Sequence, residues 1–328
     1  MTSLITLWDG RRVPRIGVGC WAIGGLFTLD GQAAGWGKVD DAQSERALDL
    51  AYDLGARLFD TADAYGTGHS EEVLGRVFGG CPEVVIATKF GFTHDRAARA
   101  LTGSDVTPDY MNRALDASLR RLGTERIGLY QIHVGDMSKA EAIALGAALE
   151  KRADSGDIDA WGWSTDDAAA VSQVVHFPHF RAVQQQLSVF YDVPEMVTLC
   201  EDHRLVNLDR SPLAMGFLTG KFTADSRLPV DDVRSAAHPW LRDFKDGRPT
   251  PEALRKLDAV RELLTVGGRS IAQGALGWIV ARSPVTLPIP GFKTEAQIRD
   301  NLGAIEKGPL PREVMEEIGV LLRDELAA

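Results

Sequence analysis

The segment "LFDTADAYGTGHSEEVLG", residues 58–75, decides the fold of this chain. It begins with an apolar run typical of a buried strand, but Asp60 and Tyr65 follow before a helix-like pattern starts. Ser70 precedes two glutamates and a helical spacing of apolar residues, so we expect it to suit a helix N-terminus. That role does not explain Asp60 or Tyr65. A strand that ends in acidic and phenolic groups predicts a reaction site at its C-terminal edge.

Eight strand-like segments alternate with helix-like segments along the chain, after a probable hairpin around Asp9 and Gly10. The strand-like segments are "RIGVG" (15–19), "ARLFDTA" (56–62), "VVIATKF" (84–90), "IGLYQIH" (127–133), "IDAWGWS" (158–164), "AVQQQLS" (182–188), "LVNLDRSPL" (205–213) and "VTLPIPG" (285–291). The clearest helix is "PDYMNRALDASLRRLG" (108–123), whose apolar stripe stops at Gly123. This order predicts an α/β fold, a (β/α)8 TIM barrel with an N-terminal β-hairpin and a C-terminal helix. No linker-like segment divides residues 1–328, so we expect a single domain.

Active sites of such barrels lie in the loops at the C-terminal ends of the strands. Asp60 and Tyr65 follow the second predicted strand, Lys89 ends the third and His133 ends the fourth. An ammonium near a phenol favours the phenolate, so we expect Lys89 to lower the pKa of Tyr65 and Asp60 to hold Lys89 charged. His133 would orient a substrate carbonyl. Each residue alone is more often structural, but four at adjacent strand ends predict acid-base chemistry on a carbonyl.

Composition narrows the possible partners and the compartment. The net charge of -10 and the pI near 5.2 argue against binding to nucleic acid or anionic membranes. No apolar stretch is long enough to span a bilayer and the first residues do not resemble a signal peptide, so we expect a cytoplasmic protein. Cys20, Cys81 and Cys200 lack the spacing of metal ligands, so reduced structural thiols are expected and no metal site is predicted.

Several long motifs resemble the aldo-keto reductase family, over nearly the whole chain. They are "IGVGCWAIGG" (16–25), "FDTADAYGTGHSEEVLG" (59–75), "SPLAMGFLTGKF" (211–222), "IAQGALGWIV" (271–280) and "PIPGFKTEAQIRDNLGA" (288–304). The resemblance implies that Asp60, Tyr65, Lys89 and His133 form the catalytic tetrad of that family. No glycine fingerprint of a Rossmann site follows a strand here, which argues against a Rossmann nicotinamide site. The resemblance instead implies that NADPH binds across the barrel mouth.

The resemblance also assigns residues to the cofactor and to the substrate. Ser164 and Gln184 would hold the carboxamide, and Ser211, Leu213 and Gly216 would follow the pyrophosphate. Lys293, beside helix N–H groups, would bind the 2′-phosphate and so favour NADP over NAD. The remaining cofactor residues implied are Trp21, Thr165, Lys221, Ile289, Gly291, Thr294, Gln297 and Asn301. The expected substrate pocket comprises Trp21, Phe27, Trp36 and Phe92, with His238 or Trp240 added from the long irregular region 222–250.

Two positions depart from the family. Many members carry asparagine after the fifth-strand serine, and a tyrosine that stacks on the nicotinamide three residues after the sixth-strand glutamine; here these positions are Thr165 and Leu187. One explanation is subfamily drift with compensation, since leucine can still pack against a ring. The other is a looser nicotinamide pocket that leaves room for a bulky substrate.

The leading hypothesis is therefore an NADP-dependent oxidoreductase that reduces a small aldehyde or ketone, such as a keto sugar or an aryl aldehyde, with Tyr65 as general acid. One alternative is an NADPH-binding sensor or regulatory subunit with little turnover. The other is a metal-dependent barrel hydrolase that uses Asp60, Asp63 and His133, although Lys89 would place a competing cation among those ligands. The sequence leaves the physiological substrate and the oligomeric state open.

Overall fold

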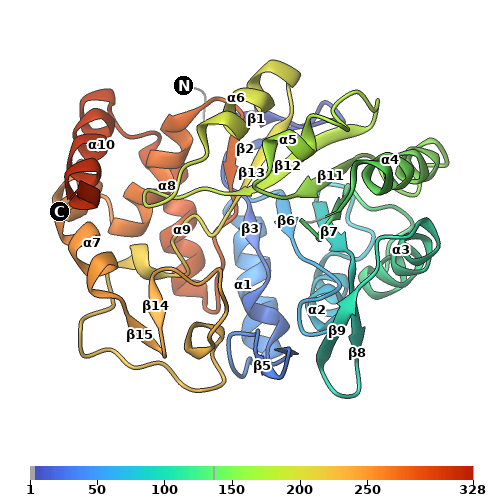
Figure 1. The fold of residues 1–328 in the computed structure, drawn as a ribbon, viewed down its shortest axis with the longest axis horizontal. Helices are drawn as coiled ribbons and strands as arrows, with labels where there is room; N and C mark the ends of the chain where they lie inside the picture. The colour runs from blue at the N-terminus through green and yellow to red at the C-terminus, as the bar shows by residue number, and fades with distance from the viewer. Residues whose placement is uncertain (1–3, 136, 328) are drawn as a thin grey trace.

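In the computed structural model, which describes residues 4–135 and 137–327, eight parallel strands form a barrel with helices around it (Figure 1). In sheet order the strands are β16 (Thr286–Pro288), β13 (Val206–Arg210), β12 (Phe180–Gln186), β11 (Trp161–Ser164), β10 (Leu129–Ile132), β7 (Val85–Phe90), β6 (Leu58–Asp60) and β3 (Val18–Gly19). Backbone hydrogen bonds from Gly17 N to Pro288 O, 2.9 Å, and from Gly19 N to Pro290 O, 3.0 Å, join the two edges. All eight predicted strands are present, and the predicted TIM barrel is confirmed.

Helices follow the strands and cover the outside of the barrel. They are α1 (Asp41–Asp53), α2 (His69–Phe78), α3 (Pro108–Leu122), α4 (Lys139–Asp154), α5 (Ala168–Val171), α6 (Pro194–His203), α7 (Pro251–Leu264), α8 (Ile271–Arg282), α9 (Glu295–Lys307) and α10 (Arg312–Ala327). Helix α3 has the predicted bounds: the Thr107 hydroxyl accepts a hydrogen bond from Tyr110 N, and Gly123 ends the helix in the left-handed conformation at φ 62°.

The expected role of Ser70 is wrong. Helix α2 begins one residue earlier, after Gly68 at φ 98°, and no side chain caps it. The Ser70 hydroxyl instead donates to Cys20 O at 2.8 Å and accepts from the Thr61 hydroxyl at 2.8 Å. Ser70 therefore ties the start of α2 to the ends of β3 and β6, which places the loop that carries Tyr65.

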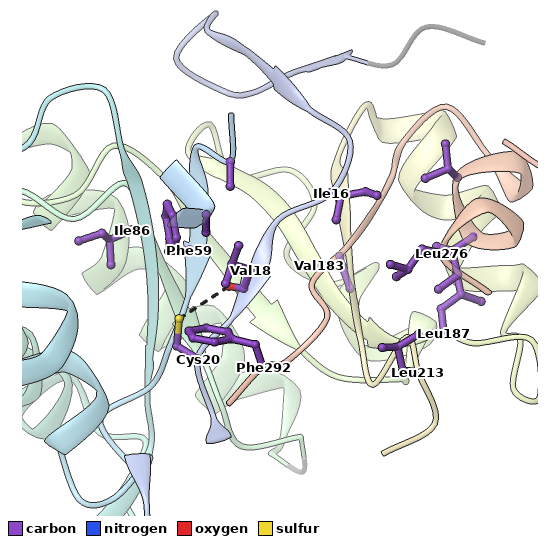
Figure 2. Packing of buried hydrophobic residues seen from close by; sticks show 14 of the residues in the cluster. Ile16, Val18, Cys20, Phe59, Ile86, Val183, Leu187, Leu213, Leu276 and Phe292 are labelled. Atoms are coloured by element: carbon purple, nitrogen blue, oxygen red, sulfur yellow. Dashed lines mark hydrogen bonds between the residues drawn. The ribbon is translucent and has the colours of Figure 1, made fainter. Parts of the chain in front are cut away.

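The side chains that point into the barrel change character along the strands. At the N-terminal end they are apolar: Leu58, Val85, Leu129, Val206 and Leu287 belong to one buried cluster. The predicted hairpin, β1 (Leu4–Thr6) with β2 (Arg12–Pro14), adds Leu7 and Val13 to the same cluster and so closes that end. A second cluster fills the space between the sheet and the helices, with Phe59, Leu276 and Phe292 among its members (Figure 2). Polar side chains are therefore confined to the C-terminal end of the barrel interior.

Two small sheets that the sequence pattern did not predict lie at that end. The first joins β5 (Gln32–Ala33), β4 (Thr28–Leu29), β9 (Ala100–Ser104) and β8 (Phe92–Asp95) from excursions after two barrel strands. The second pairs β14 (Phe244–Lys245) with β15 (Arg248–Pro249) inside the region expected to be irregular. Short 3-10 helices also occur at η1 (Ala22–Gly24), η2 (Phe217–Thr219) and η3 (Val233–Ser235). Figure 1 shows both small sheets at the lower end of the barrel, opposite the N-terminal hairpin.

Two further properties concern the helices and the thiols. Within residues 4–135 and 137–327, no helix combines the length and the apolar character that crossing a membrane requires. The three cysteines are free thiols, of which Cys20 and Cys200 are buried and Cys81 is partly exposed.

Candidate active site

The four residues expected at adjacent strand ends meet at the C-terminal mouth of the barrel. Lys89 is fully buried, and its Nζ lies 2.5 Å from Asp60 Oδ2 and 3.3 Å from the Tyr65 hydroxyl. A third bond, 2.7 Å to Thr61 O, completes the three donors of the ammonium. His133 presents its ring edge-on to Tyr65, with centroids 5.7 Å apart. The predicted convergence of these side chains is what the structure shows.

Asp60 is held by two amides in addition to Lys89. Gln184 Nε2 donates to Asp60 Oδ1 at 2.8 Å, and Gln131 Nε2 donates to the same oxygen at 3.3 Å. Because both carboxylate oxygens have partners, the buried Asp60–Lys89 pair meets the requirement that desolvated charges be hydrogen-bonded. Gln131 was not singled out from the sequence, although it precedes His133 by two residues and so points to the same side of β10.

Lys89 acts to lower the pKa of Tyr65 as expected, but it does not set the net direction. Burial raises the pKa of Tyr65 above its ordinary value, and the opposing effect of Lys89 is smaller. Burial alone would lower the pKa of Lys89, but Asp60 and Tyr65 together raise it above its ordinary value. Tyr65 is therefore protonated and Lys89 charged at neutral pH. A protonated phenol beside an ammonium is the state that a proton donor requires.

His133 is uncharged at neutral pH. Burial, then the charges of Lys89 and Arg210, hold the pKa of His133 well below its ordinary value. Its Nδ1 reaches no hydrogen-bond partner in the part of the chain that the structure describes. A buried polar atom without a partner is costly. His133 as a residue also lines the cavity that opens beside the tetrad. Phe92 packs against the same ring, with centroids 5.1 Å apart.

A close backbone approach fixes the loop that carries Tyr65. Gly66 has φ 61°, and a Cβ added there would overlap the carbonyl oxygen of Gly24 in η1. A glycine at this position therefore lets the loop pack directly on η1. Trp21, at the start of η1, then stacks on Tyr65 with centroids 5.8 Å apart and planes 20° apart. The Tyr65 ring is therefore held by stacking on Trp21, and its hydroxyl by the contact with Lys89.

A cavity of about 610 Å³ opens above these residues. The four aromatic residues expected in the substrate pocket all line it: Trp21, Phe27, Trp36 and Phe92. Leu29 and Leu101, from the unpredicted four-stranded sheet, add to the same wall. Trp240 also lines the cavity, whereas His238 is buried outside it and contacts Ala33 O at 2.8 Å.

Nearly all the residues expected to hold a cofactor line the same cavity. They are Trp21, Ser164, Thr165, Gln184, Ser211, Leu213, Gly216, Lys221, Ile289, Gly291, Lys293, Gln297 and Asn301. Thr294 does not line it: its hydroxyl caps α9 by accepting from Gln297 N at 3.3 Å. Gln297 Oε1 in turn accepts from Lys293 N at 2.7 Å. Some of the helix N–H groups expected to be free for a phosphate are thus occupied by the chain itself.

The part of the cavity lined by Lys221, Arg234 and Lys293 is basic. Burial lowers the pKa values of Lys221 and Lys293, and the charge of Arg234 adds to both shifts. Arg234 is paired with Asp232 at 2.7 Å and lies 4.6 Å over the Trp36 ring, while Lys293 Nζ contacts Trp36 O. Cations that repel one another in a partly dry cleft are stabilised by a bound anion, so this end fits the phosphates of a dinucleotide.

Leu187 does not provide the apolar surface beside the nicotinamide that one of the two alternatives required. Its side chain is fully buried, does not line the cavity and belongs to the cluster between sheet and helices, where Figure 2 shows it. Leucine at this position therefore does not pack against a ring bound in the cavity. Thr165 does line the cavity, but its hydroxyl accepts from Asp167 N at 3.1 Å, so a local turn uses one of its acceptor sites.

Among the cavity residues that were missed in the sequence, three polar ones interact with one another. Arg210 ends β13, and its Nη2 lies 2.6 Å from Asp166 Oδ2; Gln186 N donates to Asp166 Oδ1 at 2.7 Å. All three line the cavity. Arg210 is a charged residue at a strand end, which is the same signal that identified Lys89, and its position directly before Ser211 was the available clue.

The metal-site alternative does not match the geometry. Asp63 is buried outside the cavity, where burial and the neighbouring Glu71 raise its pKa well above the ordinary value. It therefore does not converge with Asp60 and His133. Over the described ranges, no group of three or more His, Cys, Asp or Glu side chains is placed to hold a metal ion.

Comparisons with known proteins agree with this architecture. The sequence model of the Aldo/keto reductase family matches residues 15–322. The NADP(+) aldo-keto reductase yakc of Schizosaccharomyces pombe is 30% identical over 305 residues, which cover 90% of this chain and 84% of the relative. The NADH-specific methylglyoxal reductase of Escherichia coli is 26% identical, with 89% and 90% covered. The structure of the glycerol dehydrogenase AKR11B4 from Gluconobacter oxydans is 27% identical and superimposes with a TM-score of 0.83, covering 99% of this chain and 97% of that one.

Proposed function

The chain belongs to the aldo/keto reductase family, and we propose that it is an NADPH-dependent reductase that converts an aldehyde or a ketone to an alcohol, with Tyr65 as proton donor. The observation that carries the proposal is the contact of 3.3 Å between the Tyr65 hydroxyl and Lys89 Nζ at the edge of the cavity. A protonated phenol held by a buried ammonium has no evident structural need, but it suits proton transfer to a carbonyl oxygen.

Each member of the tetrad has a distinct part in this proposal. NADPH supplies the hydride that the carbonyl carbon receives. The Tyr65 hydroxyl gives its proton to the carbonyl oxygen, and Lys89 stabilises the phenolate that remains. Asp60 keeps Lys89 charged and in place at 2.5 Å. His133, uncharged and lining the cavity, donates a hydrogen bond from its ring to the carbonyl oxygen and so orients it toward Tyr65.

The basic end of the cavity supports NADPH over NADH. Lys221, Arg234 and Lys293 gather there, and only NADPH carries a 2′-phosphate that adds negative charge. The relatives do not settle this preference, because one is described with NADP(+) and another as NADH-specific. The preference therefore depends on this chain's own side chains, of which Lys293 is the cation that the sequence places beside the α9 N-terminus.

Replacing Lys293 by alanine tests the cofactor assignment. Loss of one charge-assisted contact costs roughly 1.5 to 3 kcal/mol, so the Kd for NADPH should rise by about one to two decades while that for NADH changes little. Titration of each cofactor, followed by tryptophan fluorescence, measures both constants. Lys245→Ala, an exposed lysine on β14 outside the cavity, is the matched control. Equal losses for both cofactors would remove Lys293 from the 2′-phosphate site.

The aromatic wall sets the class of substrate to try first. Trp21, Trp36, Phe92 and Trp240 offer flat apolar surfaces suited to aryl aldehydes, while Gln186 and Arg210 at the floor offer polar groups suited to keto sugars. The assay follows NADPH absorbance with a panel of both kinds of carbonyl compound and identifies the alcohol formed. We expect NADPH loss that matches alcohol formation mole for mole. Cofactor binding without turnover of any carbonyl would refute the reductase proposal.

A further inference from the structure

An arginine that the proposed reaction does not use lies at the floor of the cavity. Arg210 follows Leu208 by two residues, so its side chain points into the barrel at the level of the polar layer. In the β12–β13 ladder it lies opposite Gln186, and Gln184 pairs one step earlier with Leu208. Arg210 thus adjoins Gln184, to which the nicotinamide carboxamide is assigned, and both residues line the cavity.

Asp166 holds the guanidinium in place. Its Oδ2 lies 2.6 Å from Arg210 Nη2, and its Oδ1 accepts from Gln186 N at 2.7 Å, so backbone and side chain fix the carboxylate together. The side chains of Arg210 and Asp166 are 35% and 29% exposed, which means that the pair lies in the open cavity rather than in the core. The positive charge is therefore only partly compensated on the side that faces the cavity.

Arg210 lines the same cavity as Tyr65 and His133. Burial is the main cause of the lowered pKa of His133, but the charge of Arg210 adds to it. The same charge opposes the effect of burial on the pKa of Tyr65. A fixed cation thus stands in the compartment where hydride transfer is proposed.

We infer that Arg210 makes the site distinguish the two redox states of the cofactor, so that NADPH binds more tightly than NADP+. The inference rests on the proposed function. The nicotinamide ring is neutral in NADPH and positively charged in NADP+, whereas the phosphates carry the same charge in both. A fixed cation near the ring therefore weakens binding of the oxidised form selectively, and NADP+ leaves more readily after turnover. Arg210 acts as a positioning and tuning residue, distinct from the four that handle the proton.

Two substitutions of opposite electrostatic sign test this inference. The readout is the ratio of the Kd for NADP+ to the Kd for NADPH, measured on the full chain by calorimetry without a carbonyl compound. Arg210→Met removes the cation, so the ratio should fall by roughly three- to tenfold, as expected for a partly screened charge. Asp166→Asn removes the counter-charge but keeps an acceptor for Gln186 N, so the ratio should rise.

Control variants separate charge from structure. Arg210→Lys keeps the charge and should stay close to the wild-type ratio. Arg282→Met breaks a pair of similar geometry, 2.8 Å from Asp192 and 28% and 30% exposed, outside the cavity; it should leave the ratio unchanged. A ratio unaffected by Arg210→Met, or a shift in the same direction for Arg210→Met and Asp166→Asn, would overturn the inference alone. Failure of the wild-type protein to bind either cofactor would overturn the proposed function together with it.

Discussion

Asp60 and Asp209 are equally buried aspartates on opposite faces of the same barrel. Asp60 is 2% exposed on the inward face of β6, and Lys89, Gln131 and Gln184 occupy its two oxygens. Asp209 is 0% exposed on the outward face of β13, and in the described part of the chain neither of its side-chain oxygens has a hydrogen-bond partner. Burial raises the pKa of Asp209 well above its ordinary value, although the Leu287 backbone and Arg15 act against that shift.

This difference shows that burial alone does not decide what a carboxyl group does. The inward aspartate anchors a charged lysine at the site, whereas burial favours the protonated form of the outward one. Only Asp60 has hydrogen-bond and charge partners that offset the cost of burying an ion. The comparison predicts that removing the charge of Lys89 will lower the free energy of unfolding, whereas removing the carboxyl group of Asp209 will raise it.

The largest effect is expected for Lys89→Met. Removing one partner of a buried pair leaves Asp60 uncompensated, so the free energy of unfolding should fall by about 3 to 5 kcal/mol. Turnover should also be lost, since Tyr65 no longer has a cation to stabilise its phenolate. Urea unfolding at neutral pH measures the first effect, and NADPH consumption the second. A variant as stable as the wild type would mean that the Asp60–Lys89 pair contributes nothing to the fold.

A smaller effect of opposite sign is expected for Asp209→Asn. Because the folded state raises the pKa of Asp209 above 3.8, this group favours folding below that pH and loses its contribution as pH rises through the raised value. Asparagine does not titrate, so the variant should match the wild type near pH 4 and exceed its stability in alkaline solution. The expected gain is about 1.4 kcal/mol for each unit by which folding raises the pKa of Asp209. The measurement is the free energy of unfolding of both proteins across the pH range. A difference between them that stays the same at every pH would contradict this prediction.

The smallest effect is expected for Arg282→Met, which breaks an ion pair at the surface. Arg282 lies 2.8 Å from Asp192, but both side chains are more than a quarter exposed. Water and salt screen such a pair, so the loss should stay below about 1 kcal/mol and shrink further in high salt. The same unfolding assay compares it with Lys89→Met. Losses of similar size would show that burial does not separate the two pairs.

The barrel was predictable because its signals are local. The eight strand segments lie between turn residues and helix-like segments, and α3 has a cap, an apolar stripe and Gly123 within one short segment. The tetrad could be placed because parallel strands of one barrel bring their C-terminal ends together. The four-stranded sheet at the mouth was missed, since its strands span only two to five residues and pair across distant segments.

For Leu187 and Arg210, the alternation of side chains along a strand predicts the position better than the family resemblance did. Side chains alternate faces along a strand, so Gln184 and Gln186 of β12 point into the barrel, as does Arg210 of the neighbouring β13. Leu187 points the other way, into the cluster between the sheet and the helices. Counting along β12 with a period of two would have excluded Leu187 from the cavity. Ser70 could not be corrected in this way, because its partners, Cys20 and Thr61, come from other segments of the chain.

The Tyr65→Phe variant tests the central claim most directly. The substitution removes only the hydroxyl, which lies 3.3 Å from Lys89 Nζ, and leaves the ring stacked on Trp21. In a single-turnover experiment with NADPH and an aldehyde that the wild type reduces, we expect the rate of NADPH oxidation to fall by at least about a hundredfold, because the carbonyl oxygen has lost its proton donor. The Kd for NADPH should stay near the wild-type value. A variant that oxidises NADPH at the wild-type rate would contradict the assignment of Tyr65 as the acid.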